Sequence, residues 1–194
     1  MTPLISAAEL AADLASDAPP LVLDVRGAIG VADPRGDHEA AHIPGSFYVD
    51  LDTELSGPGT PEAGRHPLPD PAVLAATATR WGVAPDTAVV VYDDNGAMSA
   101  ARLWWLLRWI GHDAVRVLDG GLSAWRAAGG EVVAGPDPEQ VPSTTPLVAH
   151  PGSRPTVEAA DILAGDVGVL LDARAEERYS GEVEPVDPVA GHIP

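Results

Sequence analysis

The side chains with the clearest chemical potential follow a short apolar run in the middle of the chain. Residues 88–92 read Ala-Val-Val-Val-Tyr, and the polar segment Asp93, Asp94, Asn95, Gly96, Ala97 and Met98 comes next. A short loop between a strand and a helix turns its backbone N–H groups inward, so this segment is a candidate cradle for an anion. The alternative interpretation is that Asp94 or Asn95 only caps the next helix.

A second pattern is His38-Glu39-Ala40-Ala41-His42, which has the spacing of the HExxH zinc motif. That motif needs one helix that carries both histidines on the same face. Gly36 and Pro44 flank the segment and leave room for little helix. The pattern therefore favours a turn over a zinc site, and no metal is expected.

Asp93 also matches the strand-end aspartate of magnesium-dependent phosphoryl transferases that use an aspartyl nucleophile. Such sites usually neutralise the phosphoryl group with a Lys, and this sequence contains none. An Arg could take that role, so this alternative stays open.

The chain contains an internal repeat. Leu-Val-Leu-Asp-Val-Arg at 21–26 returns as Val-Leu-Leu-Asp-Ala-Arg at 169–174, and the His-Ile-Pro at 42–44 returns at 192–194. A repeat of roughly 150 residues is too long for a solenoid and indicates duplicated domains. The first copy continues far beyond its His-Ile-Pro, whereas the printed sequence ends with the second one. We therefore expect an incomplete second copy, and an incomplete version of any function that needs both.

The elements that must position these residues alternate along the chain. Strands are expected at 21–24, 47–49, 88–92 and 115–118, and helices at 6–15, 71–81, 99–110 and 122–128, with an irregular loop over 52–71. This alternation predicts an α/β fold, with a parallel sheet flanked by helices on both faces, followed by the beginning of a second copy.

Three segments are expected. Residues 1–133 form the first domain, the Pro-rich stretch 134–155 is a linker, and residues 156–194 are an incomplete second domain with one helix and one strand. Because Leu170 and Leu171 would lack the rest of their sheet, we expect fraying or aggregation there.

The composition excludes several classes of function. A net charge of −18 repels phosphate backbones, so nucleic acid is not an expected partner. The absence of Cys excludes disulfides, thiolate metal sites and a cysteine nucleophile within these residues. The N-terminus does not have the pattern of a signal peptide, and no apolar run approaches the ~20 residues that span a bilayer. The expected location is the cytoplasm, with no membrane partner.

Several segments together resemble a known family. They are Leu23-Asp24-Val25-Arg26, His42-Ile43-Pro44-Gly45, the strand, loop and helix at 91–105, and Asp119-Gly120-Gly121-Leu122-Ser123-Ala124-Trp125. In this order they resemble tandem rhodanese-type sulfurtransferases, the thiosulfate and 3-mercaptopyruvate sulfurtransferases. Leu171-Asp172-Ala173-Arg174 and His192-Ile193-Pro194 extend the resemblance into the second domain.

The resemblance implies an activity and a mechanism. In the family, a Cys in the strand-to-helix loop of the C-terminal domain takes sulfur from an anionic donor as a persulfide and passes it to cyanide or a thiol. No cofactor takes part. Asp93 occupies the equivalent position in the first domain, so this domain is expected to be non-catalytic. The 194-residue chain itself is expected to be inactive.

The resemblance also carries over three candidate residues. Arg178 matches an Arg that binds the anionic donor, and a guanidinium suits a sulfonate or carboxylate. Asp52 and His66 match first-domain residues that face the active site in mercaptopyruvate-type members. Val186 follows Glu184-Pro185 where those members often have a second Arg, which favours thiosulfate as the donor.

Each of these candidates has a structural alternative. Arg178 can be a solvated surface side chain, and Asp52 and His66 can be loop and surface residues. The whole chain has an alternative as well, because a rhodanese-like domain without its Cys can serve as a non-catalytic binding or regulatory module.

Overall fold

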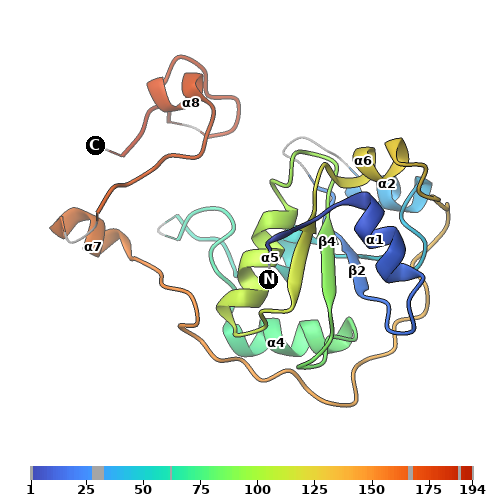
Figure 1. Ribbon diagram of the computed structural model, residues 1–194. Coiled ribbons are helices and arrows are strands. Elements are labelled where there is room, and N and C mark those ends of the chain that lie inside the picture. The colour runs from blue at the N-terminus through green and yellow to red at the C-terminus, as the bar shows by residue number, and fades with distance from the viewer. Residues whose placement is uncertain (1, 28–32, 62, 166–167, 188, 194) are drawn as a thin grey trace. The chain divides into compact units, whose positions relative to one another are not determined.

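The computed structural model describes residues 2–27, 33–61, 63–165, 168–187 and 189–193. The chain divides into two compact units, Met1–Arg154 and Pro155–Pro194, each of which is described by itself (Figure 1). Part of the Gly-rich segment expected after Arg26, namely residues 28–32, lies outside the described residues, as do Pro188 and Pro194.

The first unit contains a sheet of five strands that all run parallel. In spatial order the strands are β1 (Leu4–Ile5), β5 (Val115–Leu118), β4 (Val89–Tyr92), β2 (Leu21–Asp24) and β3 (Phe47–Tyr48). All four residues of the central strand β4 are buried, as expected for a continuous apolar run that is covered on both faces. The predicted parallel sheet is confirmed.

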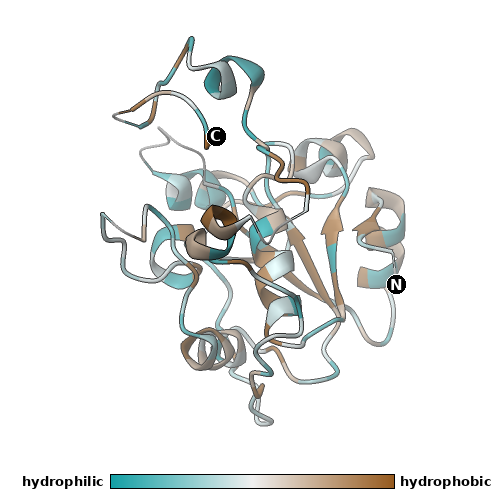
Figure 2. Ribbon diagram, turned by 90° about the vertical axis from the view of Figure 1, so that its left-hand side faces the viewer, coloured by the Kyte–Doolittle hydropathy of each residue, from teal (hydrophilic) through white to brown (hydrophobic). Residues whose placement is uncertain are grey.

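Helices cover both faces of this sheet (Figure 1). One face carries α4 (Pro71–Arg80) and α5 (Ala100–Trp109), and the other carries α1 (Ala7–Leu14) and α6 (Gly121–Ala127). Along β4, Val89 and Val91 pack into the first core, whereas Val90 and Tyr92 pack into the second. This alternation is the period of two that a strand imposes, and Figure 2 shows the strands as an apolar centre between the helices.

Two short helices of the first unit were not predicted from the sequence. α2 (Pro34–Ala40) begins at Asp33, whose side chain accepts a hydrogen bond from the backbone N–H of Gly36 at 2.9 Å. α3 (Leu51–Glu54) begins at Asp50, which accepts from the N–H of Thr53 at 2.8 Å. In both cases an N-cap side chain starts a helix in a segment that has few apolar residues.

Residues 134–154 contain no helix or strand, yet they are fixed along the first unit. The N–H of Gly135 donates to the carbonyl of Glu39 at 2.8 Å, and the N–H of Ser143 donates to the carbonyl of Thr79 at 2.9 Å. Further along, the N–H of His150 donates to a carbonyl at the end of α5 at 2.8 Å. The predicted linker segment therefore packs against the first unit over most of its length.

The second unit contains α7 (Ala159–Ala164) and α8 (Glu176–Ser180). The strand predicted from the repeat does not form among its described residues, and Val169 and Leu171 are 87% and 82% exposed. A single strand needs neighbours to share its backbone hydrogen bonds, and the described part of this unit supplies none. Across the described residues of both units, no helix has the length and apolarity to cross a membrane.

Candidate functional site

The loop after β4 is folded around the carboxylate of Asp93. Oδ1 of Asp93 accepts hydrogen bonds from the N–H groups of Asn95 at 3.2 Å and Ala97 at 2.9 Å. Oδ2 accepts from the N–H groups of Ser99 at 2.9 Å and Ala100 at 3.0 Å. The side chain is buried, at 1% exposure. The N–H groups of the loop therefore converge on one carboxylate, which belongs to the loop itself.

The backbone of the loop makes this arrangement possible. Gly96 and Ala97 both have positive φ, 75° and 66°, at the turn where the N–H groups of Asn95 and Ala97 donate to the same oxygen of Asp93. Ala97 is a non-glycine residue in the left-handed region, which is a strained conformation. Met98, the last residue of the loop, is 69% exposed and makes no contribution to the cradle.

The capping alternative is only partly correct. Asp94 does cap a helix, but the helix is α6, because its Oδ1 accepts from the N–H of Ser123 at 2.9 Å. The N-cap residue of α5 is Ser99, which makes no side-chain cap, and Asp93 satisfies the first N–H groups of that helix instead. Since both carboxylate oxygens of Asp93 are bound and buried, its geometry does not support an aspartyl nucleophile.

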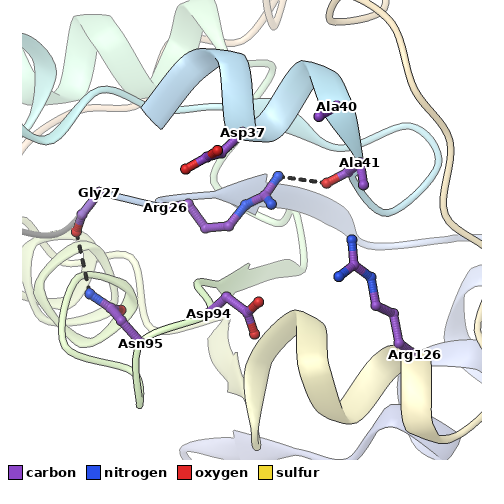
Figure 3. Close-up of a pocket in the computed structure, with 8 residues that line it drawn as sticks. All are labelled: Arg26, Gly27, Asp37, Ala40, Ala41, Asp94, Asn95 and Arg126. Carbon is purple, nitrogen blue, oxygen red and sulfur yellow. Dashed lines mark hydrogen bonds between the residues drawn. The ribbon is translucent and has the colours of Figure 1, made fainter. Parts of the chain in front are cut away.

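A cavity of about 410 Å³ lies beside this loop (Figure 3). It is bounded by residues after β2 and β4, by α2 and by α6, which is the edge of the sheet where sites form in open α/β folds. Its charged lining residues are Arg26, Asp37, Asp94 and Arg126. The Asn95 side chain also lines it, and in the orientation that satisfies its amide the Nδ2 donates to the Asp93 carboxylate, at 2.6 Å from Oδ2.

The cavity backs onto a buried polar cluster around Asp24. Oδ2 of Asp24 contacts Nη2 of Arg26 at 2.8 Å, Nδ1 of His38 at 2.8 Å and the hydroxyl of Tyr92 at 2.8 Å. Burial alone would raise the pKa of Asp24, but the hydrogen bonds from His38, Arg26 and Tyr92 outweigh it and hold that pKa below its usual value. Burial is the main cause that raises the pKa of Tyr92 well above its ordinary range.

The HExxH pattern takes part in this cluster and does not form a zinc site. Contrary to the expectation of little helix, His38 lies in α2, but the helix ends before His42. The two rings stack with centroids 4.1 Å apart, and Nδ1 of His42 contacts the carbonyl oxygen of His38 at 2.9 Å. Nε2 of His38 lies 3.0 Å from a carboxylate oxygen of Asp137, although this contact is not aligned as a hydrogen bond. Within the described residues, no group of His, Cys, Asp or Glu side chains could hold a metal ion.

The structure brings Asp52 and His66 together. Oδ1 of Asp52 lies 2.7 Å from Nε2 of His66, and the pair is open to solvent, with 76% and 35% of the side chains exposed. His66 has a φ of 67°, so its backbone is in the left-handed region. The guanidinium of Arg102 holds this loop, since it donates to the carbonyl oxygens of Leu55, His66 and Pro67 at 2.9–3.1 Å.

In the second unit, Arg178 is held by two carboxylates. Its Nη2 lies 2.8 Å from Glu184 and 2.9 Å from Asp187. A hydrogen bond from the backbone N–H of Asp187 is the main cause that lowers the pKa of Glu184 to about 2. As an anion-binding residue, Arg178 would have to exchange these partners for its ligand.

The internal repeat recurs as a three-dimensional clasp. In the first copy, Nη2 of Arg26 contacts Asp24 at 2.8 Å, and in the second, Nη2 of Arg174 contacts Asp172 at 2.6 Å. Each guanidinium also donates to the carbonyl oxygen just before the repeated His, at 2.7 Å and 2.8 Å. Asp-x-Arg and His-Ile-Pro therefore form one structural motif that occurs twice in the chain.

The repeated histidines are held in the same way as well. His42 stacks on His38 of α2, and His192 stacks on Tyr179 of α8 at a centroid distance of 4.0 Å. In each copy, Nδ1 of the histidine contacts the carbonyl oxygen of the residue on which it stacks, at 2.9 Å and 2.7 Å.

Sequence reasoning missed two arginines of this region, Arg102 and Arg126. Arg102 is one of two charged residues in the otherwise apolar helix α5, and a charged residue in such a helix is a signal that it has a specific partner. Arg126 follows the conspicuous Leu-Ser-Ala-Trp segment, and its sequence context gives no comparable signal.

Comparisons with known proteins agree with this geometry. The family model of the rhodanese-like domain matches residues 6–128. The chain is 46% identical over 193 residues to the "Putative thiosulfate sulfurtransferase SseB" of Mycobacterium tuberculosis, and 46% identical over 199 residues to the "Probable 3-mercaptopyruvate sulfurtransferase" of Pseudomonas aeruginosa. Each alignment covers 98% of this chain and 68% of the relative.

A solved structure gives the same result for the fold. The 3-mercaptopyruvate sulfurtransferase SseA of Escherichia coli matches with a TM-score of 0.81 and 29% sequence identity, over 100% of this chain and 73% of that chain. The match therefore extends through the first domain and into the second. By its family model, its relatives and its fold, the chain belongs to the rhodanese-like family and is similar to the tandem-domain thiosulfate and 3-mercaptopyruvate sulfurtransferases.

Proposed function

We propose that this chain is the non-catalytic first lobe, with the start of the second lobe, of an enzyme that moves sulfane sulfur from thiosulfate or 3-mercaptopyruvate to cyanide or a thiol. The sequence contains no Cys, so the persulfide-forming thiol is supplied by residues outside these 194. The single observation that carries the proposal is the state of the loop after β4. Its four N–H groups bind the Asp93 carboxylate, where an active domain would hold an anionic sulfur.

Asp93 keeps this lobe silent for two physical reasons. A carboxylate has no thiolate to attack the donor and cannot carry a persulfide. Its oxygens already accept the hydrogen bonds of the N–H groups that would otherwise lower the pKa of a thiol. The first lobe is therefore a scaffold, and its contribution to catalysis comes from residues that it presents to the second.

Asp52 and His66 are the proposed contribution. A His whose Nε2 is held by a carboxylate has a fixed tautomer and orientation, which suits it to proton transfer or to positioning a carboxylate donor. Arg178 is the proposed ligand for the anionic end of the donor, after exchange of Glu184 or Asp187. The Val186 that follows Glu184-Pro185 favours thiosulfate as the donor.

The test compares the printed chain with a longer natural form that includes the continuation of its reading frame. Thiocyanate formation from thiosulfate and cyanide should be absent for the printed chain and present for the longer form. In the longer form, His66→Gln should lower kcat/KM for 3-mercaptopyruvate by at least about ten-fold. A continuation without a Cys in a strand-to-helix loop, or turnover by the printed chain, would contradict the proposal.

The self-filled loop also favours a second candidate, a non-catalytic rhodanese-like module that binds a partner or regulates it. In that case the longer form would form a stable complex without sulfur transfer, and Arg178→Gln would leave the complex intact. Loss of sulfur transfer in the same variant would favour the enzyme.

A further inference from the structure

The two copies of the repeat differ in charge at one matched position. His42 and His192 each stack on a helix residue and contact that residue's carbonyl oxygen, so His38 and Tyr179 are structurally equivalent. The residue before His38 is Asp37, and the residue before Tyr179 is Arg178. The first copy therefore carries a carboxylate where the second carries a guanidinium, and Asp37 lines the cavity of about 410 Å³.

The other charged side chains of this cavity differ in how far partners neutralise them. Arg26 is neutralised by Asp24 at 2.8 Å, and its Nη2 also donates to a backbone carbonyl. Asp94 uses Oδ1 as a helix cap, and no described residue contacts its Oδ2. The side chain of Arg126 makes no hydrogen bond or ion pair with any residue that the structure describes. In Figure 3, the Arg126 side chain extends from α6 toward the cavity, and Asp37 and Asp94 lie on the two sides of Arg26.

We propose that this cavity binds a small dipolar ligand, with an ammonium or guanidinium group at one end and a carboxylate at the other. The cationic end lies between Asp37 and Asp94, and the carboxylate end pairs with Arg126. A guanidinium and a carboxylate make charge-assisted hydrogen bonds, which are stronger than neutral ones. Because the anion cradle is closed by Asp93, a purely anionic ligand has only Arg126 to pair with and is repelled by the two exposed carboxylates.

The size of the cavity is compatible with this ligand class. Small-molecule sites usually occupy ~300–1,000 Å³ and contain a few polar groups that fix the ligand's orientation. The cavity is open and its charged groups are exposed at Asp37, Asp94 and Arg126, so the ion pairs with the ligand are partly screened and binding is weak. The proposal is independent of sulfur transfer, because it concerns a site in the lobe that has no thiol.

The test is a titration followed by amide NMR of the ¹⁵N-labelled 194-residue chain. L-Arginine is the dipolar probe, agmatine is the same cation without the carboxylate, and thiosulfate is the anion. We expect saturable shifts at Asp94, Asn95 and Arg126 with L-arginine, at least tenfold weaker binding of agmatine, and no shifts there with thiosulfate.

Variants separate the site from nonspecific charge effects. Asp37→Asn and Arg126→Gln should each weaken L-arginine binding at least tenfold, and both change exposed side chains, so the fold is retained. Asp86→Asn and Arg80→Gln are matched controls on exposed residues at the other end of β4, and they should bind as the parent does. Shifts that are larger with thiosulfate, equal binding by all variants, or no saturable shift with L-arginine would each overturn the proposal.

Discussion

The Oδ2 atom of Asp93 lies 2.9 Å from the backbone nitrogen of Ser99, so the buried carboxylate accepts a hydrogen bond at the start of α5. It is one of four N–H contacts that converge on one carboxylate at the end of the central strand. The Asp93 carboxylate occupies the N–H groups that could otherwise bind an external anion. The same N–H groups could stabilise a thiolate if a Cys replaced Asp93.

Asp93→Cys is expected to create a reactive thiol. The N–H groups that now bind the carboxylate would stabilise a thiolate and bring its pKa below the ~8.5 of an ordinary Cys. The measurement is the rate of alkylation by iodoacetamide as a function of pH. Asp94→Cys is the matched control, because it lies one residue along the same loop and outside the cradle. Identical pH profiles for the two thiols would contradict a functional cradle.

The Asp24 cluster predicts a specific acid sensitivity. The folded pKa of Asp24 is below its usual value, so its ionisation contributes stability above the unfolded pKa of ~3.9, and this is lost as the pH falls through the folded pKa. Asp24→Asn should lose about 3–5 kcal/mol at pH 7, since it leaves buried charged partners without their counter-ion.

The same variant should show a flatter dependence of the free energy of unfolding on pH below about 4. Urea denaturation at several pH values measures both effects. Asp86→Asn, an exposed substitution, is the control for loss of a single acidic charge. If Asp24→Asn and the control have the same stability at pH 7, the cluster is not a stabilising one.

Arg102 is expected to hold the Asp52–His66 pair in place. Burial lowers the pKa of Arg102, and its guanidinium donates hydrogen bonds to three carbonyl oxygens of the loop. Arg102→Met should therefore speed backbone amide hydrogen exchange across residues 55–67 by at least about ten-fold. Added guanidinium ion at low concentration should partly restore protection in this variant.

Arg108→Met is the control for that experiment. Arg108 lies on the same helix but pairs with Asp113 at 3.1 Å near the surface, so its loss should leave exchange in the loop unchanged. If both variants exchange alike in residues 55–67, Arg102 has no special role in positioning His66.

The sheet and the helices on its two faces could be predicted because short stretches of sequence indicate each of these elements. Val89, Val90 and Val91 form a continuous β-branched run, which is typical of a central parallel strand. α2 and α3 could not be predicted, because a single N-cap carboxylate, Asp33 or Asp50, starts each of them among polar residues. In a sequence, one possible N-cap residue is a weak signal for a helix, and a polar composition is more typical of a loop.

The sequence predicted a polar loop after β4 but not how its side chains are arranged. The pattern of strand, polar loop and helix indicated inward N–H groups, and the family resemblance implied that Asp93 stands where a Cys would. It could not show that the carboxylate turns inward, because this depends on the left-handed backbone of Gly96 and Ala97. The Asp24 cluster was missed because His38, Tyr92 and Asp137 are far apart in the sequence and meet only in the fold.

Chemical rescue tests most directly whether Asp93 fills an anion cradle. Asp93→Ala leaves four N–H groups without their acceptor and should lower stability by about 3 kcal/mol. Thermal unfolding is then compared in sodium formate and in sodium chloride of equal ionic strength, for the parent, Asp93→Ala and Asp94→Ala. Formate should raise the Tm of Asp93→Ala alone, because the small carboxylate enters the vacated loop. An equal effect of formate on all three proteins, or none on Asp93→Ala, would contradict it.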